Sequence, residues 1–494
     1  MKLSYLIEEI DISKRLAFCD VDVTGIATDS RSLKAGDCFV AIRGHAADGH
    51  AFVEEAVRKG ASALVVEHAG EGSIPTVVVR ESSLAAALMA KRFFGDPASR
   101  LRLAGITGTN GKTSSAFLLR SIMNIAHGPC GIIGTIGYGD SDELASVRNT
   151  TPGAVDLYRV MDGFLKQGCR STVMEVSSHA AEQGRIAGLE FDVGAFTNVT
   201  RDHLDYHVTV EKYIEAKESF VRTLVESGRK KRPGTFVYNI DDPEVARVAK
   251  RFAGPSLSFG LSSSADVRAE GLKANLKGTR FDLVIGSGRG HLDLKLLGTI
   301  SVYNALTAAA CAHALGVDID RIKMGLENVA QVPGRFQVVS IGRGPTVVVD
   351  YAHTPDALEK LLNFCRELRP RAIVTVFGCG GDRDKGKRPM MGGIAARLSN
   401  IVFITDDNPR TEDPDRIVRE ILDGVGTSGV PVHVVRDRRS AIRGAVGAAG
   451  EGDLVVIAGK GHENEQICRD GRVPFNDALE AEEALRGREV DHQG

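Results

Sequence analysis

The chain carries a glycine-rich loop of the kind that binds phosphate. Gly108-Thr109-Asn110-Gly111-Lys112-Thr113 follows the apolar run LRLAGIT and precedes the helix-forming stretch SSAFLLRSIM. Small residues let backbone N–H groups approach phosphate oxygens, and a helix N-terminus adds positive partial charge. In such a loop Lys112 would reach the β- and γ-phosphates of a nucleotide, and the Thr113 hydroxyl would bind Mg²⁺. Ile106 stands where the strict motif has glycine, so an ordinary glycine-rich turn is the alternative.

A second group of reactive side chains follows the next two apolar runs. Glu175 lies at the end of the run STVMEV, directly before Val176. His203 and His207 follow VGAFTNV, and Lys217 lies in a helical pattern. The i,i+4 spacing of the two histidines could bind zinc, but no glutamate lies between them and no cysteine is near. A solvated polar loop is the plainer alternative.

The neighbouring residues Ser177, Ser178 and His179 contain the residue types of a hydrolase triad. Residues adjacent in sequence cannot generally form a line of nucleophile, base and orienting group. We therefore discount a hydrolase on this motif.

The elements that position these residues are predicted from alternating patterns. Short β-branched runs that end in Gly, Asp or Asn alternate with helical patterns, which is typical of an α/β fold with a parallel sheet. The runs of the last segment are TVVVDY, AIVTVFG, IVFITD, VHVVRD and LVVIAG. In open α/β sheets ligands bind beyond the carboxyl ends of the strands, where nearly all the polar clusters of this chain lie.

A chain of 494 residues exceeds what one hydrophobic core usually organises. We expect three domains, over residues 1–99, 100–334 and 335–494. The boundaries rest on the linker-like stretch FFGDPASR and on VPGRF, which follows a long alanine-rich helix. Residues 256–300 are expected to form peripheral hairpins.

Composition excludes several classes of partner. The net charge of −2 argues against bulk binding of nucleic acid or an anionic membrane. No basic start followed by an apolar run and no membrane-spanning stretch is present, and the eight cysteines are scattered. We expect a cytoplasmic protein.

The form TGTNGKT resembles the loop of the Mur ligases and of the related folylpolyglutamate synthetases. The resemblance extends over essentially the whole chain. It implies the three-domain Mur ligase architecture, with a central P-loop-type parallel sheet and a Rossmann-like C-terminal domain. It also implies that ATP phosphorylates a carboxylate and that an amine then attacks the acyl phosphate.

The resemblance implies a role for each member of the second group. Lys112, Glu175, His203 and Lys217 would be catalytic. Thr113, Glu175, His203 and Lys217 would bind Mg²⁺, with Lys217 carbamylated (N6-carboxylysine). Carbamate oxygens are hard ligands suited to Mg²⁺, whereas an ammonium would repel it.

The resemblance also assigns the nucleotide contacts. Those of ATP would be Gly108, Thr109, Asn110, Gly111, Lys112, Thr113, Asn304, Arg335, Asp350 and His353. Those of the UDP-substrate would be Ser30, Thr150, Thr151, Ser177, Gln183 and Arg185. For Asp350 a helix-capping role is an equal alternative. The stretch Thr299-Ile300-Ser301 before Asn304 departs from the aromatic-containing form of the family.

The added amino acid is indicated by Asp407-Asn408-Pro409-Arg410, because DNPR with arginine in fourth place resembles the diaminopimelate-adding members. Meso-diaminopimelate carries a carboxylate and an ammonium at its distal end. Arg383 and Arg410 would bind the carboxylate and Glu463 the ammonium. The full predicted set is Arg383, Asp407, Asn408, Pro409, Arg410, Gly459 and Glu463. The sequence Asp-Asn-Pro is also strong turn chemistry, and the turn could aim the arginine.

The predicted reaction joins meso-diaminopimelate to UDP-N-acetylmuramoyl-L-alanyl-D-glutamate, with ATP as co-substrate. We expect the enzyme to be a monomer. Two rivals are enzymes: a lysine-adding Mur ligase and a folylpolyglutamate synthetase. The third rival is a nucleotide-gated binding or regulatory module.

Overall fold

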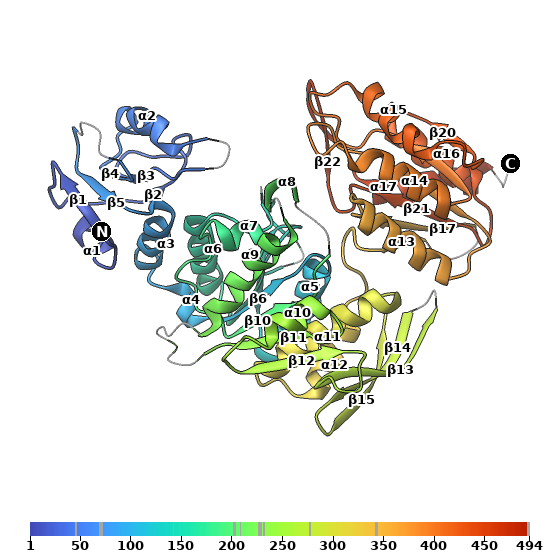
Figure 1. Cartoon of the computed structure of the whole chain (residues 1–494), viewed down its shortest axis with the longest axis horizontal. Coiled ribbons are helices and arrows are strands. Elements are labelled where there is room, and N and C mark those ends of the chain that lie inside the picture. Colours follow the sequence, from blue (N-terminus) through green and yellow to red (C-terminus); the bar gives the residue numbers. More distant parts are fainter. Residues whose placement is uncertain are drawn as a thin grey trace. The chain divides into compact units, whose positions relative to one another are not determined.

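The computed structural model describes residues 1–44, 47–68, 73–141, 143–147, 149–200, 204–207, 209–225, 230, 233–275, 278–340 and 344–491. The chain forms two compact units. Figure 1 labels the helices and strands from which they are built. The first comprises Met1–Glu270, Asp282–His291 and Tyr303–Asn328. The second comprises Gly271–Phe281, Leu292–Val302 and Val329–Gly494.

The amino-terminal part of the first unit is a five-stranded sheet of order β1-β5-β4-β3-β2. Only β1 runs antiparallel to its neighbour. The elements are α1 (Leu3–Leu6), β1 (Ile12–Leu16), β2 (Ile26–Ala27), β3 (Cys38–Val40), η1 (Gly49–Phe52), α2 (Val53–Arg58), β4 (Ala63–Val66), β5 (Thr76–Val79), α3 (Ser82–Phe93) and α4 (Pro97–Arg100).

The central sheet has ten strands in the order β15-β14-β13-β12-β11-β10-β6-β9-β7-β8. Its elements are β6 (Arg102–Thr107), α5 (Lys112–His127), β7 (Cys130–Ile133), β8 (Tyr138–Gly139), α6 (Ala154–Lys166), β9 (Ser171–Glu175), α7 (Ser178–Glu182), β10 (Val193–Phe196), α8 (Leu204–His207), α9 (Val210–Arg222), η2 (Thr223–Val225), β11 (Thr235–Asn239), α10 (Pro243–Ala249), β12 (Ser256–Gly260), β13 (Val267–Asn275), β14 (Gly278–Ile285), β15 (Gly288–Leu294), α11 (Gly298–Ala314) and α12 (Ile319–Asn328). The strands within residues 256–300 form one end of this sheet, as expected for a peripheral segment.

The rest of the second unit is built on a six-stranded sheet of order β16-β17-β21-β18-β19-β20, in which only β16 is antiparallel. Its elements are β16 (Gln337–Ser340), β17 (Thr346–Asp350), α13 (Pro355–Glu367), β18 (Ile373–Phe377), α14 (Lys387–Leu398), β19 (Ile401–Ile404), α15 (Pro414–Val425), β20 (Val432–Val434), α16 (Arg438–Ala448), β21 (Leu454–Ala458), β22 (Glu465–Cys468), β23 (Gly471–Pro474) and α17 (Asp477–Asp491).

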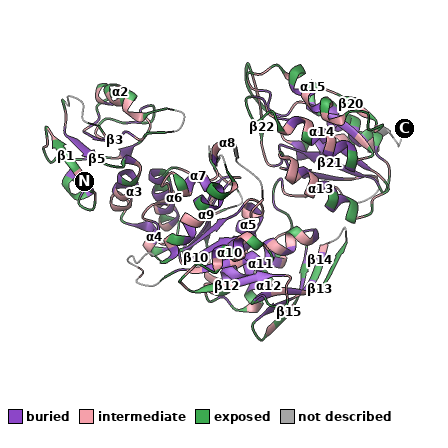
Figure 2. Cartoon of the chain, in the orientation of Figure 1, coloured by how far each residue is buried: buried purple, intermediate pink, exposed green. Residues whose placement is uncertain are grey.

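Helices cover both faces of the six-stranded sheet, which explains why its central strands are apolar throughout. Along β21, Val456 packs with α13, α14 and α15, while the alternate residues Val455 and Ile457 pack with α16 and α17. Successive strand residues point to opposite faces, so a strand covered on both faces loses the apolar–polar alternation. Figure 2 shows these strands as buried. The predicted α/β class is confirmed.

Parallel pairing brings the carboxyl ends of neighbouring strands together. In the first unit, β6 lies between β9 and β10, so the loops after Thr107, Glu175 and Phe196 are adjacent. In the second unit, β18 lies between β21 and β19. No helix among the described residues is long and apolar enough to cross a membrane.

Candidate active site

The glycine-rich loop joins β6 to α5 as predicted. Gly111 caps α5 with a φ of 87°, a conformation that glycine adopts without steric cost. The loop is braced from the segment after β10. Asn198 Oδ1 accepts from the Asn110 N–H at 2.9 Å, and Thr197 Oγ1 donates to the Asn110 carbonyl at 2.7 Å. No sequence motif had indicated Thr197 or Asn198.

A buried carboxylate lies beside the first turn of α5. Glu175 accepts from the Thr113 hydroxyl at 3.1 Å and from the hydroxyl and N–H of Thr135 at 3.0 and 2.9 Å. Glu175 and Thr113 are both buried. The structure therefore brings together these two predicted metal ligands and adds Thr135, which no motif had indicated.

Lys217 reaches the same loop from α9. Its side chain is 1% exposed, and its Nζ donates to the Gly108 carbonyl at 2.9 Å. Lys112 Nζ donates to the same carbonyl at 2.8 Å and to the Thr109 carbonyl at 2.9 Å. The two lysines thus converge on one oxygen atom.

The residues present fit a magnesium ion of the nucleotide-bound kind. Mg²⁺ in such sites takes one or two carboxylates from the protein and its remaining ligands from phosphates and water. Glu175 and the Thr113 hydroxyl are hard oxygen donors of this type. Within the described residues, no group of three His, Cys, Asp or Glu side chains could hold a metal by itself. His203, the fourth predicted ligand, lies outside the described residues.

Asn304, predicted to contact the nucleotide, lies on α11 against the glycine-rich loop. It is 6% exposed, and its Oδ1 accepts from the Ser115 hydroxyl at 3.5 Å. A Cβ on Gly111 would collide with the same Oδ1 atom. A side chain at position 111 would therefore displace Asn304 from the loop.

Five of the residues predicted to bind the UDP-substrate form one hydrogen-bonded group beside Glu175. The Thr151 hydroxyl donates to the Glu175 main-chain carbonyl at 2.9 Å, and Arg185 Nη1 donates to the Thr151 carbonyl at 2.9 Å. The remaining contacts join Ser177 to Thr151, Thr150 to Thr135, and Arg185 to Gln183. Glu175 and Thr135 therefore connect the predicted metal ligands to the residues predicted to bind the UDP-substrate.

Ser30 belongs to the five-stranded part of the unit, where its hydroxyl donates to Glu55 Oε2 at 3.0 Å. The structure also pairs Ser178 Oγ with His207 Nε2 at 2.9 Å, and His207 Nδ1 with Glu182 Oε2 at 3.3 Å. This resembles a hydrolase line built from Ser178 and Glu182 on α7 and His207 on α8. Ser178 is 2% exposed, which is unfavourable for a nucleophile that must reach substrate.

Arg335, Asp350 and His353 lie together in the second unit. The Arg335 guanidinium lies 4.8 Å from the Tyr351 ring centroid. Asp350 accepts from the Phe336 and Ala352 N–H groups at 2.7 and 2.8 Å. Burial raises the pKa of Asp350, opposed by Arg335 and these N–H groups. Thr354, rather than Asp350, caps α13, so the capping alternative for Asp350 is wrong.

The residues predicted for the amino acid surround the carboxyl ends of β18, β19 and β21. Asn408 Nδ2 donates to Glu463 Oε2 at 2.8 Å, and Arg410 Nη1 donates to the Gly381 carbonyl at 2.8 Å. A Cβ on Gly459 would lie 2.6 Å from Asp407 Oδ2. Burial lowers the pKa of Arg410, and the charge of Arg383 lowers it further.

Lys460 is a further residue of this site, and no predicted role had been assigned to it. It is fully buried, and its Nζ donates to Glu463 Oε2 at 2.7 Å and to Asn408 Oδ1 at 3.0 Å. The site therefore contains two arginines near one another, and a separate glutamate held by lysine and asparagine.

Comparison with known proteins agrees with this geometry. Three family models match: "Mur ligase family, catalytic domain" over residues 22–91, "Mur ligase middle domain" over 106–312, and "Mur ligase, glutamate ligase domain" over 334–461. A relative from Bacillus licheniformis is 43% identical over 94% of this chain and 95% of its own length. The chain belongs to the Mur ligase family. That relative is named UDP-N-acetylmuramoyl-L-alanyl-D-glutamate–2,6-diaminopimelate ligase, as is one from Geobacter metallireducens with 41% identity over the whole of both chains.

Solved structures share the Mur ligase fold. The structure of a UDP-N-acetylmuramoyl-L-alanyl-D-glutamate–2,6-diaminopimelate ligase has a TM-score of 0.68 and 32% identity, and covers 99% of this chain and 100% of its own. The MurF ligase of Thermotoga maritima, solved in complex with ADP, has a TM-score of 0.64 at 20% identity. It covers 95% of this chain and all of its own. The expected three-domain Mur ligase architecture is thus confirmed at the level of the fold.

Proposed function

We propose that this Mur ligase adds meso-diaminopimelate to UDP-N-acetylmuramoyl-L-alanyl-D-glutamate in peptidoglycan synthesis, with ATP as co-substrate. The observation that carries the proposal is the grouping of Arg383, Arg410 and Glu463 in the second unit of a chain whose relatives bear that name. The arginines suit the distal carboxylate and Glu463 suits the distal ammonium.

A lysine-adding enzyme is disfavoured by the same arginines. Lysine has no distal carboxylate, so its binding would leave Arg410 without an anionic partner in a partly buried site. A site built around polar groups rejects an analogue that leaves them unpaired by up to roughly 10⁴–10⁵-fold. A folylpolyglutamate synthetase is disfavoured because the family match extends over residues 22–91, the part assigned to the UDP-substrate.

The reaction transfers the γ-phosphoryl group of ATP to the γ-carboxylate of D-glutamate, which gives an acyl phosphate and ADP. The amine then attacks the acyl carbon, a C–N bond forms, and the C–O bond to phosphate breaks with loss of a proton from nitrogen. Lys112 would neutralise the transferring phosphoryl group, and Arg185 would hold the acceptor. Fixed charges aimed at developing negative charge are usually the largest contribution to such catalysis.

Thr113, Glu175, His203 and a carbamylated Lys217 are the proposed protein ligands of Mg²⁺. When bound, Mg²⁺ would neutralise charge as phosphate approaches an anionic carboxylate. The convergence of Lys217 and Lys112 on Gly108 supports a place for Lys217 in this group.

The decisive experiment is a phosphate-release assay with the muramoyl-dipeptide nucleotide and a panel of amino acids. We expect release that requires ATP, the acceptor and meso-diaminopimelate together, with L-lysine far slower. Slow release indifferent to acceptor and amino acid would instead indicate a nucleotide-gated regulatory module.

The three segments 1–99, 100–334 and 335–494 are the proposed domains for UDP-substrate, ATP and amino acid. Each family match lies inside one segment except for residue 334. We also propose a monomer acting in the cytoplasm, where ATP is available.

A further inference from the structure

Two loops carry the arginines assigned to the distal carboxylate. Arg383 lies between β18 and α14, and Arg410 lies between β19 and α15. The charge of Arg383 lowers the pKa of Arg410, so the two side chains repel each other. The backbone is also strained, since Asp382 and Arg410 have φ values of 53° and 52°. Left-handed backbone is unfavourable at a residue other than glycine, so other contacts must hold both loops.

Arg388 supplies the first of these contacts from the first turn of α14. Its side chain is 0% exposed and forms a two-pronged pair with Glu412, at 3.0 Å from Nη1 to Oε1 and 2.8 Å from Nη2 to Oε2. Nη1 also donates to Glu420 at 2.6 Å, and Nη2 donates to the Gly380 carbonyl at 3.2 Å. Arg388 therefore joins α14, α15 and the loop of Arg383.

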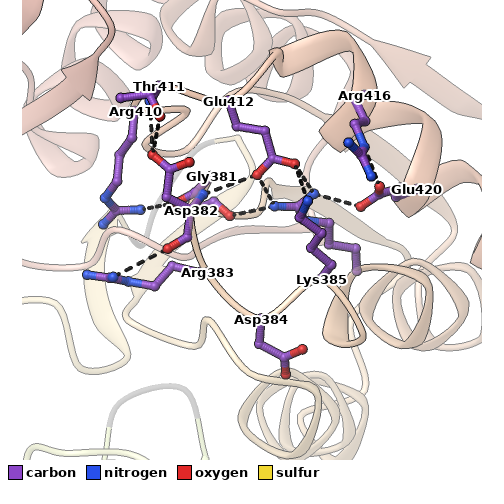
Figure 3. Close-up of polar contacts among 12 residues, drawn as sticks. Gly381, Asp382, Arg383, Asp384, Lys385, Arg410, Thr411, Glu412, Arg416 and Glu420 are labelled. Atoms are coloured by element: carbon purple, nitrogen blue, oxygen red, sulfur yellow. Dashed lines mark hydrogen bonds and ion pairs between the residues drawn. The ribbon is translucent and has the colours of Figure 1, made fainter. Parts of the chain in front are cut away.

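Glu412 continues the chain of contacts into both loops (Figure 3). Asp382 directly precedes Arg383, and its N–H donates to Glu412 Oε2 at 3.1 Å. Thr411 directly follows Arg410. Its N–H and hydroxyl donate to the Asp382 carboxylate at 3.0 and 2.8 Å. One carboxylate on each loop thus binds the other loop.

Backbone contacts complete the connection. The Gly381 N–H donates to the Asn408 carbonyl at 2.9 Å, and Arg410 itself donates to the Gly381 carbonyl. A Cβ on Gly381 would collide with the Pro409 carbonyl. The two loops are therefore packed backbone to backbone, and in Figure 3 the guanidinium groups of Arg383 and Arg410 lie on the same side of this contact.

We infer that Glu412, supported by Arg388 and linked to Asp382, is a positioning residue that sets selectivity for an amino acid with a distal carboxylate. It holds two mutually repelling arginines at a fixed separation before substrate arrives. The inference rests on the proposed function and deepens it, because Glu412 acts through Arg383 and Arg410.

The test is a double-mutant cycle between Glu412→Gln and Arg410→Ala, read as the KM for meso-diaminopimelate in phosphate release. Glu412→Gln keeps the side-chain shape but removes the charge. Loss of hydrogen bonds to a charged group should raise this KM by roughly 10–100-fold, with kcat, the KM for ATP and the KM for acceptor little changed. In the Arg410→Ala background the same substitution should raise it less than about threefold, because residues that act through one another are not additive.

Asp453→Asn is the matched control. Asp453 accepts a two-pronged pair from Arg371 and an N–H from Gly450 in the same unit, with a side chain 5% exposed. It should leave the KM for meso-diaminopimelate unchanged.

Three outcomes would overturn the inference. The first is an unchanged KM for meso-diaminopimelate in Glu412→Gln. The second is a double variant whose rise in this KM equals the product of the rises in Glu412→Gln and Arg410→Ala. The third is a rise in this KM in Asp453→Asn as large as that in Glu412→Gln. A wild-type chain that does not use meso-diaminopimelate would reject the proposed function instead. If the Glu412→Gln variant fails to fold, Asp382→Asn is a second variant that should raise the same KM.

Discussion

Two lysine side chains share one hydrogen-bond acceptor at the glycine-rich loop. Lys112 and Lys217 both donate to the Gly108 carbonyl, and Lys217 is almost fully buried. A buried ammonium is costly unless it is paired, and two close ones repel each other. Conversion of Lys217 to a carbamate would replace this repulsion with attraction to Lys112 or to a metal ion.

Lys217→Ala should lose most activity, and small carboxylic acids such as acetate should restore part of it by occupying the place of the carbamate. The measurement is phosphate release with and without added acid. Lys212→Ala, an exposed position on the same helix, should retain full activity. Full activity in Lys217→Ala would remove the residue from the mechanism.

Arg410→Ala should reduce discrimination between the two diamino acids. Loss of a charge-assisted hydrogen bond should lower kcat/KM for meso-diaminopimelate by about 10–150-fold, corresponding to roughly 1.5–3 kcal/mol. L-Lysine has no carboxylate at that point, so its kcat/KM should not fall. Steady-state kinetics with both amino acids give the ratio, and a parallel loss for both would contradict the assignment.

Lys460→Met should have a different signature. The methionine fills the space but no longer donates to Glu463 or Asn408. Both diamino acids carry the distal ammonium that Glu463 is proposed to bind, so we expect KM to rise for both, by about 10-fold or more. A rise for meso-diaminopimelate alone would place Lys460 with the arginines.

At the scale of elements, the sequence predicted most strands of both main sheets because their runs are apolar and bounded by turn residues. The strands β7, β8 and β16 were missed, and β7 shows why. Cys130–Ile133 has four residues, follows a proline and contains Gly131, so its own pattern is weak. It forms because it pairs with β9, and Gly131 is required there because a Cβ would collide with Phe164.

The candidate site was predictable where a motif carried it and unpredictable elsewhere. The glycine-rich loop, Glu175, Lys217 and the DNPR turn stand at strand ends or in recognisable patterns. Thr135, Thr197 and Glu412 are ordinary residue types whose partners lie far away in sequence. Only the fold shows which of them meet.

The link between α14 and the turn after β19 predicts a pH dependence of stability. Hydrogen bonds from Arg388 lower the pKa of Glu412 from 4.5 to about 2, and Lys385 and the Asp382 N–H act in the same direction. A group whose pKa falls on folding stabilises fully above its unfolded pKa, and this contribution is lost as the pH falls towards the folded value.

The difference in unfolding midpoint between wild type and Glu412→Gln should therefore be constant above about pH 5. It should narrow as the pH falls from about 4.5 towards 2. Urea unfolding at a series of pH values provides the measurement. A difference that grows on acidification would contradict this sign.

At the scale of the whole molecule, Arg185 and Arg410 belong to different units, and we propose that they bind different substrates. Arg185 lies with the acceptor residues of the first unit, and Arg410 lies in the second. Within the described residues, Arg185 and Arg410 share no hydrogen-bond partner. Their effects on catalysis should therefore be separable.

Arg185→Ala should raise the KM for the muramoyl-dipeptide nucleotide by about 10-fold or more, and leave the KM for meso-diaminopimelate unchanged. Arg410→Ala should do the reverse. Losses in kcat/KM at independent sites usually add as free energies, so the double variant should show the product of the two fold-changes. A smaller combined loss would reveal coupling between the units.

The neighbouring guanidinium groups of Arg383 and Arg410 also affect how the enzyme should be stored and assayed. A pair of cations held together by the fold attracts any compact anion, not only the intended substrate. Sulfate or citrate in a storage buffer would compete with the amino acid, so affinities measured in chloride and in sulfate at equal ionic strength should differ.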